Sequence, residues 1–188
     1  MNKMAKINET TTLAKGKFLE LQRISFTNDD GKELQWEACQ RVNKVNAVSM
    51  FAIRPRAKAI VLVRQFRAPI GKYCIECPAG LIEDGETAME SARRELLEET
   101  GYTIGRVLDS GVPAENSAGM TGELTTPIVV LIDENVPRKN QRMDASEHIE
   151  ILEVPINKLC NFLKKATENG DVVSGKLLAF SYGMRITF

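Results

Sequence analysis

The sequence predicts an α/β or α+β layer fold, in which strands and helices pack around one hydrophobic core. Three observations support this prediction. Short strand-like runs follow one another between residues 18 and 77, one uninterrupted helical segment comes after them, and two further helical segments end the chain. The length of 188 residues is enough for one domain with a sizeable core. We divide the chain into an N-terminal hairpin extension, residues 1–45, and a main domain, residues 46–188.

The first half of the chain contains two pairs of predicted strands. Residues 18–41 form two alternating runs, FLELQRISF and ELQWEACQR, around the turn signal Asn28-Asp-Asp-Gly31, which predicts a hairpin. The apolar runs AVSMFAIR and AIVLVRQF flank the polar turn that begins at Pro55, and both are typical of buried strands.

Strands and helices alternate in the second half. Tyr73–Cys77 is predicted as a short strand, and residues 86–100 as a helix that lacks Gly and Pro and stops at Gly101. Pro127–Ile132 and His148–Val154 are predicted as strands, residues 155–167 and 174–184 as helices, and residues 119–126 and 133–144 as loops.

Composition excludes several function classes. Lys plus Arg and Asp plus Glu both number 25, so the formal net charge is zero, whereas a protein that binds nucleic acid usually has a basic excess. We expect no nucleic-acid partner and no membrane partner, because no apolar run approaches the length of a membrane span. The polar N-terminus lacks the apolar stretch of a secretion signal, so we expect a cytoplasmic protein.

Two of the four cysteines, Cys74 and Cys77, form a C-x-x-C. Such a pair can serve redox chemistry or half of a zinc site. The chain has one histidine, His148, so a zinc site would be poorly supplied with ligands. We therefore predict buried, inert thiols.

The helical segment 86–100 carries an unusual set of acidic residues. Glu95 and Glu99 are four residues apart and Glu98 is three from Glu95, so the side chains share one helical face. Like charges at this spacing weaken a helix, unless the face is solvated or a cation lies between the carboxylates. Hard oxygen ligands suit Mg²⁺ or Mn²⁺. The alternative is a surface helix laced with salt bridges, such as Arg94 with Glu98.

The full pattern decides between these alternatives. The segment fits G-x5-E-x7-R-E-U-x-E-E-x-G-U, where U is apolar or aromatic, from Gly80 to Tyr102. At a background use near 7% for each of the seven fixed residues, chance occurrence is on the order of one in a hundred million per start position. The segment resembles the signature box of the Nudix hydrolases. Tyr102 is bulkier than the usual aliphatic residue at the end of this box.

The resemblance implies a Nudix fold, a mixed β-sheet sandwiched between helices. It also implies that Glu95, Glu99 and the carbonyl of Ala79 bind metal, with Mg²⁺ as the cofactor and Mn²⁺ as a substitute. Glu98 would be a further ligand or lie next to the catalytic water. Arg94 would orient the glutamates through salt bridges.

Resemblance to ADP-ribose and ADP-sugar pyrophosphatases extends to residues 64–80 and to the segment Gly31–Glu37. It implies a nucleotide-sugar substrate and a homodimer in which the hairpin contributes aromatic contacts to the base. Trp36 and Phe18 are the candidates for stacking, although Phe18 could equally be a core residue of its strand. The substrate-binding set is completed by Glu37, Arg41 and Arg67, the arginines as bidentate phosphate ligands. Arg64 has the weaker claim.

Hydrolysis of a pyrophosphate also needs a base that activates water. Members of this type place the base on a loop away from the box, and Ser146–Glu150 resembles that segment. Glu147 is therefore the candidate base, with Glu98 as the competing assignment and Glu150 as a second choice. We expect His148 to be structural or exposed.

The expected reaction is Mg²⁺-dependent cleavage of a nucleoside diphosphate sugar into a nucleoside monophosphate and a sugar phosphate. One departure from the pattern concerns the sugar: Ala118 stands where many ADP-ribose pyrophosphatases have a proline. ADP-ribose, ADP-glucose, ADP-mannose and GDP-mannose therefore stay open. Two alternatives are a house-cleaning hydrolase of nucleoside triphosphates, typically shorter and without the hairpin, and a nucleotide-sugar sensor, which usually lacks box glutamates.

Overall fold

A computed structural model describes residues 4–143 and 148–186. The chain forms two compact units, each of which is described by itself. The first unit comprises Met1–Ala47 and Pro113–Thr125, and the second unit comprises Val48–Val112 and Thr126–Phe188. The elements are mixed α and β, as the sequence predicts.

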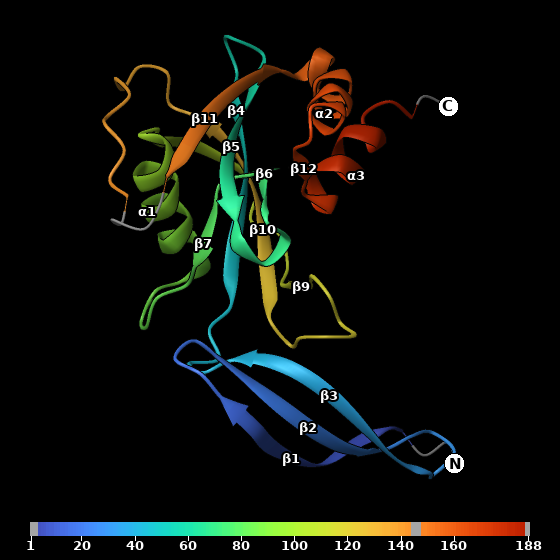
Figure 1. The fold of residues 1–188 in the computed structure, drawn as a ribbon. Coiled ribbons are helices and arrows are strands. Elements are labelled where there is room, and N and C mark those ends of the chain that lie inside the picture. Colours follow the sequence, from blue (N-terminus) through green and yellow to red (C-terminus); the bar gives the residue numbers. More distant parts are fainter. Residues whose placement is uncertain (1–3, 144–147, 187–188) are drawn as a thin grey trace. The chain divides into compact units, whose positions relative to one another are not determined.

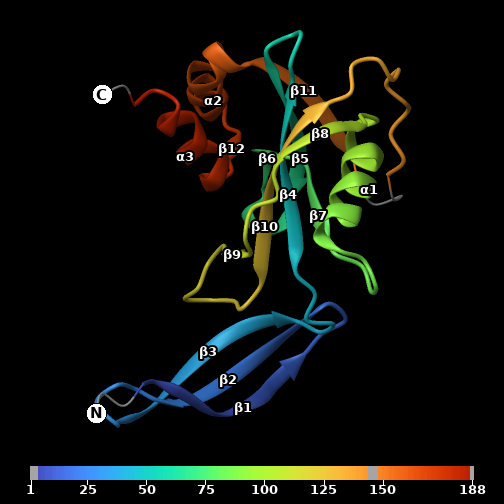
Figure 2. The same ribbon diagram turned by 180° about the vertical axis from the view of Figure 1, so that it is seen from behind.

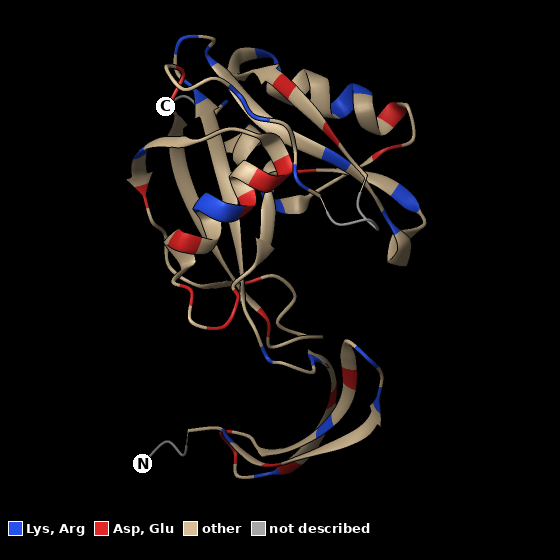
Figure 3. Cartoon of the chain, turned by 90° about the vertical axis from the view of Figure 1, so that its left-hand side faces the viewer, with Lys and Arg blue, Asp and Glu red and all other residues tan. Residues whose placement is uncertain are grey.

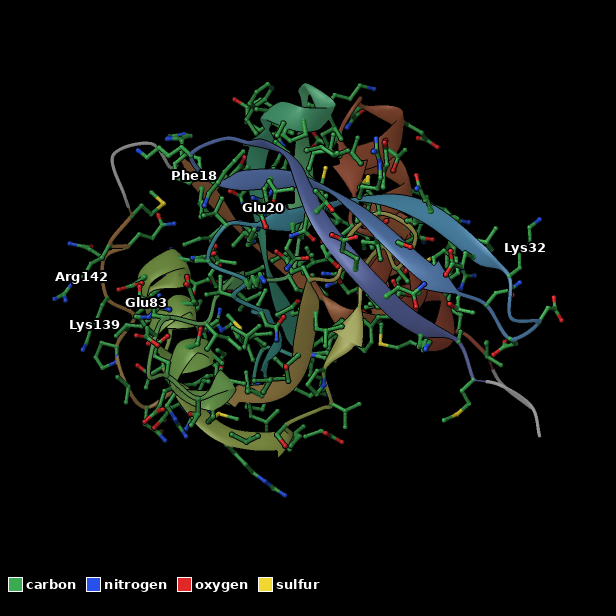
Figure 4. All side chains as sticks on the ribbon, turned by 90° about the horizontal axis from the view of Figure 1, so that it is seen from below. Phe18, Glu20, Lys32, Glu83, Lys139 and Arg142 are labelled. Carbon is green, nitrogen blue, oxygen red and sulfur yellow. The ribbon has the colours of Figure 1, made fainter. Side chains whose placement is uncertain are left out.

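The first unit contains a three-stranded antiparallel sheet in the order β1-β2-β3 (Figure 1). The predicted hairpin is confirmed as β2 (Leu19–Thr27) and β3 (Glu33–Arg41), which pair from Leu19 with Arg41 to Thr27 with Glu33. Sequence reasoning missed β1 (Lys6–Lys15), whose ten residues are all exposed and therefore carry no apolar alternation. Figure 4 shows Phe18 and Lys32 at opposite ends of this sheet.

The second unit is built on a mixed sheet. Its path is β12-β6-β5-β4-β10-β8, with β11 paired to β5 and β7 paired to β4. The strands are β4 (Ala47–Arg54), β5 (Ala59–Arg67), β6 (Lys72–Glu76), β7 (Ala79–Leu81), β8 (Ile104–Asp109), β10 (Leu124–Ile132), β11 (Ile149–Pro155) and β12 (Val172–Val173). The short strand β12 runs parallel to β6, whereas β5 is antiparallel to β4, β6 and β11.

Helices cover both faces of this sheet. Helix α1 (Ala88–Thr100) lies on one face, and α2 (Leu159–Glu168) and α3 (Gly175–Gly183) lie on the other (Figure 1 and Figure 2). Because side chains of a strand alternate between faces, β4 sends Met50 towards α1 and Phe51 towards α2 and α3. The apolar runs of β4 and β5 are buried on both sides for this reason. None of the helices described in residues 4–143 and 148–186 is long and apolar enough to cross a bilayer.

Several boundaries differ from the prediction. Helix α1 begins at Ala88, because Thr87 is its extended N-cap. The predicted loop 119–126 ends earlier, since β10 already starts at Leu124, where it pairs with β9 (Ala114–Glu115). The predicted helix 155–167 opens with a 3₁₀ turn, η2 (Ile156–Lys158). The strands β7, β8, β9 and β12 were missed, since they are short or, like β8, contain a glycine.

Candidate functional site

Local chemistry fixes where α1 begins and ends. The Thr87 hydroxyl accepts a hydrogen bond from the backbone N–H of Glu90, whose side chain accepts from the backbone N–H of Thr87, a capping box. The hydrogen bonds that the Glu90 carboxylate accepts from the backbone N–H and the hydroxyl of Thr87 lower its pKa. At the other end Gly101 has a φ of 72° and its N–H donates to Leu97 O. A Cβ at Gly101 would lie 1.9 Å from the carbonyl oxygen of Lys139, so this position requires glycine twice over.

The three candidate glutamates of α1 lie against β7 to different extents. Glu99 is 6% exposed, and its Oε2 accepts a hydrogen bond of 3.0 Å from the N–H of Ala79. Glu95 lies over Gly80, where a Cβ would come within 2.0 Å of Oε1. The Glu98 side chain is 39% exposed. The structure therefore brings Glu95 and Glu99 together at the backbone of β7 and leaves Glu98 nearer to solvent.

Arg94 connects this acidic face to the turn before the helix. Its guanidinium donates to Glu86 at 2.8 and 2.9 Å, to Glu95 at 2.7 Å, to Glu98 at 3.2 Å and to Leu81 O at 2.9 Å. The hydrogen bonds to Glu86 are the main cause of a raised pKa for Arg94. Figure 3 shows the basic segment of α1 between acidic segments. The ion pairs of the salt-bridge alternative are thus present, and they hold the glutamates side by side.

The same contacts act on Glu86. The hydrogen bond from Arg94 and one from the N–H of Glu83, at 3.0 Å, lower the pKa of the Glu86 carboxyl to about 2. Glu86 is therefore ionised at any pH at which the protein is expected to work. The ionised Glu86 carboxylate therefore holds the Arg94 guanidinium where it also donates to Glu95 and Glu98.

The donor set of this face fits a hard divalent cation. Glu95, Glu98 and Glu99 offer carboxylate oxygens alone, the ligand type that hard divalent cations prefer. Within residues 4–143 and 148–186 no three His, Cys, Asp or Glu side chains are already gathered in a metal-binding arrangement. Magnesium commonly binds through one or two carboxylates, with waters and substrate phosphates completing its shell. Two glutamates held against β7 satisfy that requirement.

The candidate base, Glu147, lies outside the described residues. Of its neighbours, His148 and Glu150 are exposed, and Glu150 accepts a hydrogen bond of 3.2 Å from Arg64.

The candidate base-stacking residues occupy separate places on the sheet of the first unit. Trp36 is 52% exposed, and its Nε1–H donates to Gly119 O at 2.9 Å. Phe18 is 69% exposed and precedes β2. Trp36 pairs with Ile24, six residues along β2 from Phe18, which is about 20 Å at the rise of a strand. The two candidate positions of one chain are therefore well separated along the sheet.

The charged candidates each have a carboxylate or guanidinium partner. Arg41 is hydrogen-bonded to Glu123, and Glu37 faces Arg23 at 4.0 Å. In the second unit Arg67 donates to Glu76 at 2.7 Å. The sequence did not point to Glu123, because 82 positions separate it from Arg41 and no pattern links them.

Arg64 is a structural residue. It donates to Asp171 at 2.8 and 2.9 Å, and its guanidinium lies over the Tyr73 ring at 4.1 Å. The hydrogen bond to Asp171 is the main cause of its raised pKa. These contacts connect β5 and β6 to the segment between α2 and β12, so Arg64 holds secondary-structure elements together.

The cysteines behave as predicted for inert thiols. Cys74 and Cys77 are each 5% exposed, and burial raises the pKa of Cys74 to about 11 and that of Cys77 to about 12. Thiols with such pKa values carry almost no reactive thiolate at neutral pH. All four cysteines are free, and Cys39 is exposed.

The chain resembles known proteins over most of its length. The model of the NUDIX domain matches residues 43–174. The chain is 30% identical over 184 residues to the ADP-sugar pyrophosphatase of Mus musculus, covering 92% of this chain and 84% of the mouse protein. It is 32% identical over 151 residues to the ADP-ribose pyrophosphatase of Bacillus subtilis, covering 79% and 80%.

The fold has a counterpart among solved structures. A chain described as "Crystal structure of ADP compounds hydrolase" superposes with a TM-score of 0.71 at 19% identity, covering 87% of this chain and 85% of that one. The domain match spans most of the chain and includes α1 with its complete set of box residues. This protein therefore belongs to the Nudix hydrolase family.

Proposed function

We propose that this enzyme hydrolyses the pyrophosphate bond of a nucleoside diphosphate sugar, releasing a nucleoside monophosphate and a sugar phosphate. The observation that carries the proposal is the acidic face of α1, on which Glu95 and Glu99 lie against β7 and Arg94 holds Glu95 and Glu98 together. The relatives named ADP-sugar and ADP-ribose pyrophosphatase support the substrate class.

Divalent metal ions are the general cofactors of Nudix hydrolases, and we propose Mg²⁺ here, with Mn²⁺ as a substitute. Glu95, Glu99 and the carbonyl of Ala79 would hold the ion, with Glu98 as a further ligand. When bound, it would neutralise pyrophosphate charge. Arg94 keeps the carboxylates in place and Glu86 keeps Arg94 in place. We assign Glu147 as the base that takes the proton from the attacking water, and Glu98 is the alternative.

The substrate would be held by the remaining candidates. A guanidinium has five N–H donors, so Arg41 and Arg67 keep donors for phosphate beside their bonds to Glu123 and Glu76. Trp36 would stack on the base, with Glu37 beside it on β3. Neither the nucleobase nor the sugar of the substrate is assigned, because Ala118 departs from the pattern of many ADP-ribose enzymes.

We also propose that the enzyme is a homodimer formed through the first unit. Its sheet exposes large apolar side chains, with Phe18 69% and Leu19 51% exposed and all of β1 exposed. The separation of about 20 Å between Phe18 and Trp36 along the sheet supports the same idea, since both can contact one base when two chains supply them. In the cytoplasm, where we place the enzyme, its free thiols would stay reduced.

A hydrolysis panel tests the proposal. ADP-ribose, several ADP- and GDP-sugars and deoxynucleoside triphosphates are compared with Mg²⁺, with the Glu99→Gln variant as the control. Turnover of nucleotide sugars that is lost in the variant is the expected result. Turnover of triphosphates alone would replace the proposal with the house-cleaning function. Binding of nucleotide sugars without turnover of any substrate would make the protein a sensor. Sedimentation of the purified enzyme tests the dimer.

A further inference from the structure

The loop that follows β10 closes the C-terminal end of α1. The last carbonyls of a helix have no partner within the helix. Here four consecutive carbonyls are satisfied by the segment 138–142. Arg142 N donates to Glu98 O at 2.9 Å, Gln141 Nε2 to Glu99 O at 2.6 Å, Arg138 Nε to Thr100 O at 2.9 Å and Lys139 N to Gly101 O at 2.9 Å. Figure 4 shows Lys139 and Arg142 of this segment beside α1.

Two of the candidate metal ligands lie at this end of the helix. Helix α1 ends at Thr100, so Glu98 and Glu99 belong to its last turn. Terminal turns open more easily than the middle of a helix. Two carboxylates that bind the same cation must keep a fixed spacing, and this requires a backbone that is held in place. The backbone of both glutamates is held by the segment 138–142 through carbonyl contacts.

Gln141 makes a second backbone-directed hydrogen bond, which connects this segment to another element. Its Nε2 also donates to Ile149 O at 3.1 Å, so the two hydrogens of one amide reach the last turn of α1 and the first residue of β11. A side-chain amide has two N–H donors, and the two carbonyls are their nearest acceptors, while Met143 Sδ lies farther from Nε2, at 3.7 Å. Gln141 thus connects the helix with the box glutamates to the first residue of β11.

We propose that Gln141 is a positioning residue of the metal site. It acts through the backbone of Glu99 and ties this end of α1 to Ile149, the first residue of β11. The proposal rests on the proposed function only in taking the box glutamates as metal ligands. Partners that orient metal ligands typically change metal affinity about 10- to 100-fold when they are removed.

The test is the affinity for Mn²⁺ alone, measured by electron paramagnetic resonance without substrate. Gln141→Met keeps the length of the side chain and removes both donors. We expect its Kd for Mn²⁺ to rise about tenfold. The comparator is Arg138→Met, which removes one hydrogen bond between the same loop and the same helix end, together with the contact of the guanidinium over the Tyr102 ring, and no hydrogen bond to β11. Its Kd is expected to change much less, and thermal unfolding of both variants reports the loss of stability that they share.

A second variant guards against misfolding. Gln141→Asn keeps the amide but is one methylene shorter, so it cannot span both carbonyls, and its Kd is expected to rise in the same direction. An unchanged Kd in the folded Gln141 variants, or a rise no larger than in Arg138→Met, would overturn the proposal. On a nucleotide sugar, kcat is expected to fall with little change in KM. A wild-type protein that binds Mn²⁺ but cleaves no nucleotide sugar would refute the proposed function, while the Kd values would still decide the role of Gln141.

Discussion

The carboxylate of Glu95 occupies the space in which a side chain at Gly80 would lie. An ideal Cβ at Gly80 would be 1.9 Å from Glu95 Cδ and within 2.4 Å of both carboxylate oxygens. Real Cβ atoms essentially never make such contacts, so any other residue here moves Glu95. The glycine is needed for this close approach between β7 and α1.

Gly80→Ala is therefore expected to lower kcat/KM strongly. Displacing a positioned group by about 1 Å can cost on the order of 100-fold in rate, and we expect a loss of that size. Steady-state kinetics on the substrate found in the hydrolysis panel measures it. Gly175→Ala is the matched control, because a Cβ at Gly175 meets no atom within 4 Å. Equal activity of the two variants would contradict the role of Gly80.

Glu86→Gln is expected to destabilise the fold in a pH-dependent way. The folded pKa of Glu86 is about 2, below its ordinary value of 4.5, so the folded state binds fewer protons than the unfolded state between these values. The stabilisation by the ionised carboxylate is complete above about pH 4.5 and is lost as pH falls towards 2. Urea unfolding from neutral to acid pH should show a wild-type advantage that shrinks in this window. A constant difference would contradict the prediction.

Trp36→Ala is expected to raise KM for the nucleotide substrate with little change in kcat. Stacking of a base on an aromatic side chain contributes roughly 1–3 kcal/mol, so a rise of about tenfold is expected. Trp36→Phe keeps an aromatic ring, although a smaller one, and removes the hydrogen bond to Gly119 O, so its KM should lie between those of the wild type and the alanine variant. Unchanged KM values in both variants would remove Trp36 from the substrate site.

Thiol labelling should distinguish the cysteines. In the native protein at mildly alkaline pH, Cys39 is expected to react rapidly with a disulfide reagent, whereas Cys74 and Cys77 react only after unfolding. Cys39→Ser should abolish the rapid phase.

The pKa of Cys77 rises from 9.0 to about 12 on folding, so the folded state keeps a proton that the unfolded state loses. Stability should therefore decrease as pH rises through this range.

The sequence by itself determined the elements whose cause is local or periodic. The hairpin β2–β3 follows from Asn28–Gly31 between alternating runs, and the end of α1 follows from Gly101. The glutamates of α1 could be named because a helix places residues three and four apart on one face. The exposed, polar strand β1 gave no such signal, so it appeared only in the structure.

Only the tertiary structure decided what each charged side chain does. The sequence does not reveal that Arg64 binds Asp171, that Arg41 binds Glu123, or that Gln141 bridges Glu99 and Ile149. The physical reason is the separation in sequence. Arg64 and Asp171 lie 107 positions apart, Arg41 and Glu123 lie 82 apart, and Gln141 and Glu99 lie 42 apart. Contacts over such separations depend on how strands and loops pack, and no periodicity in the chain encodes them.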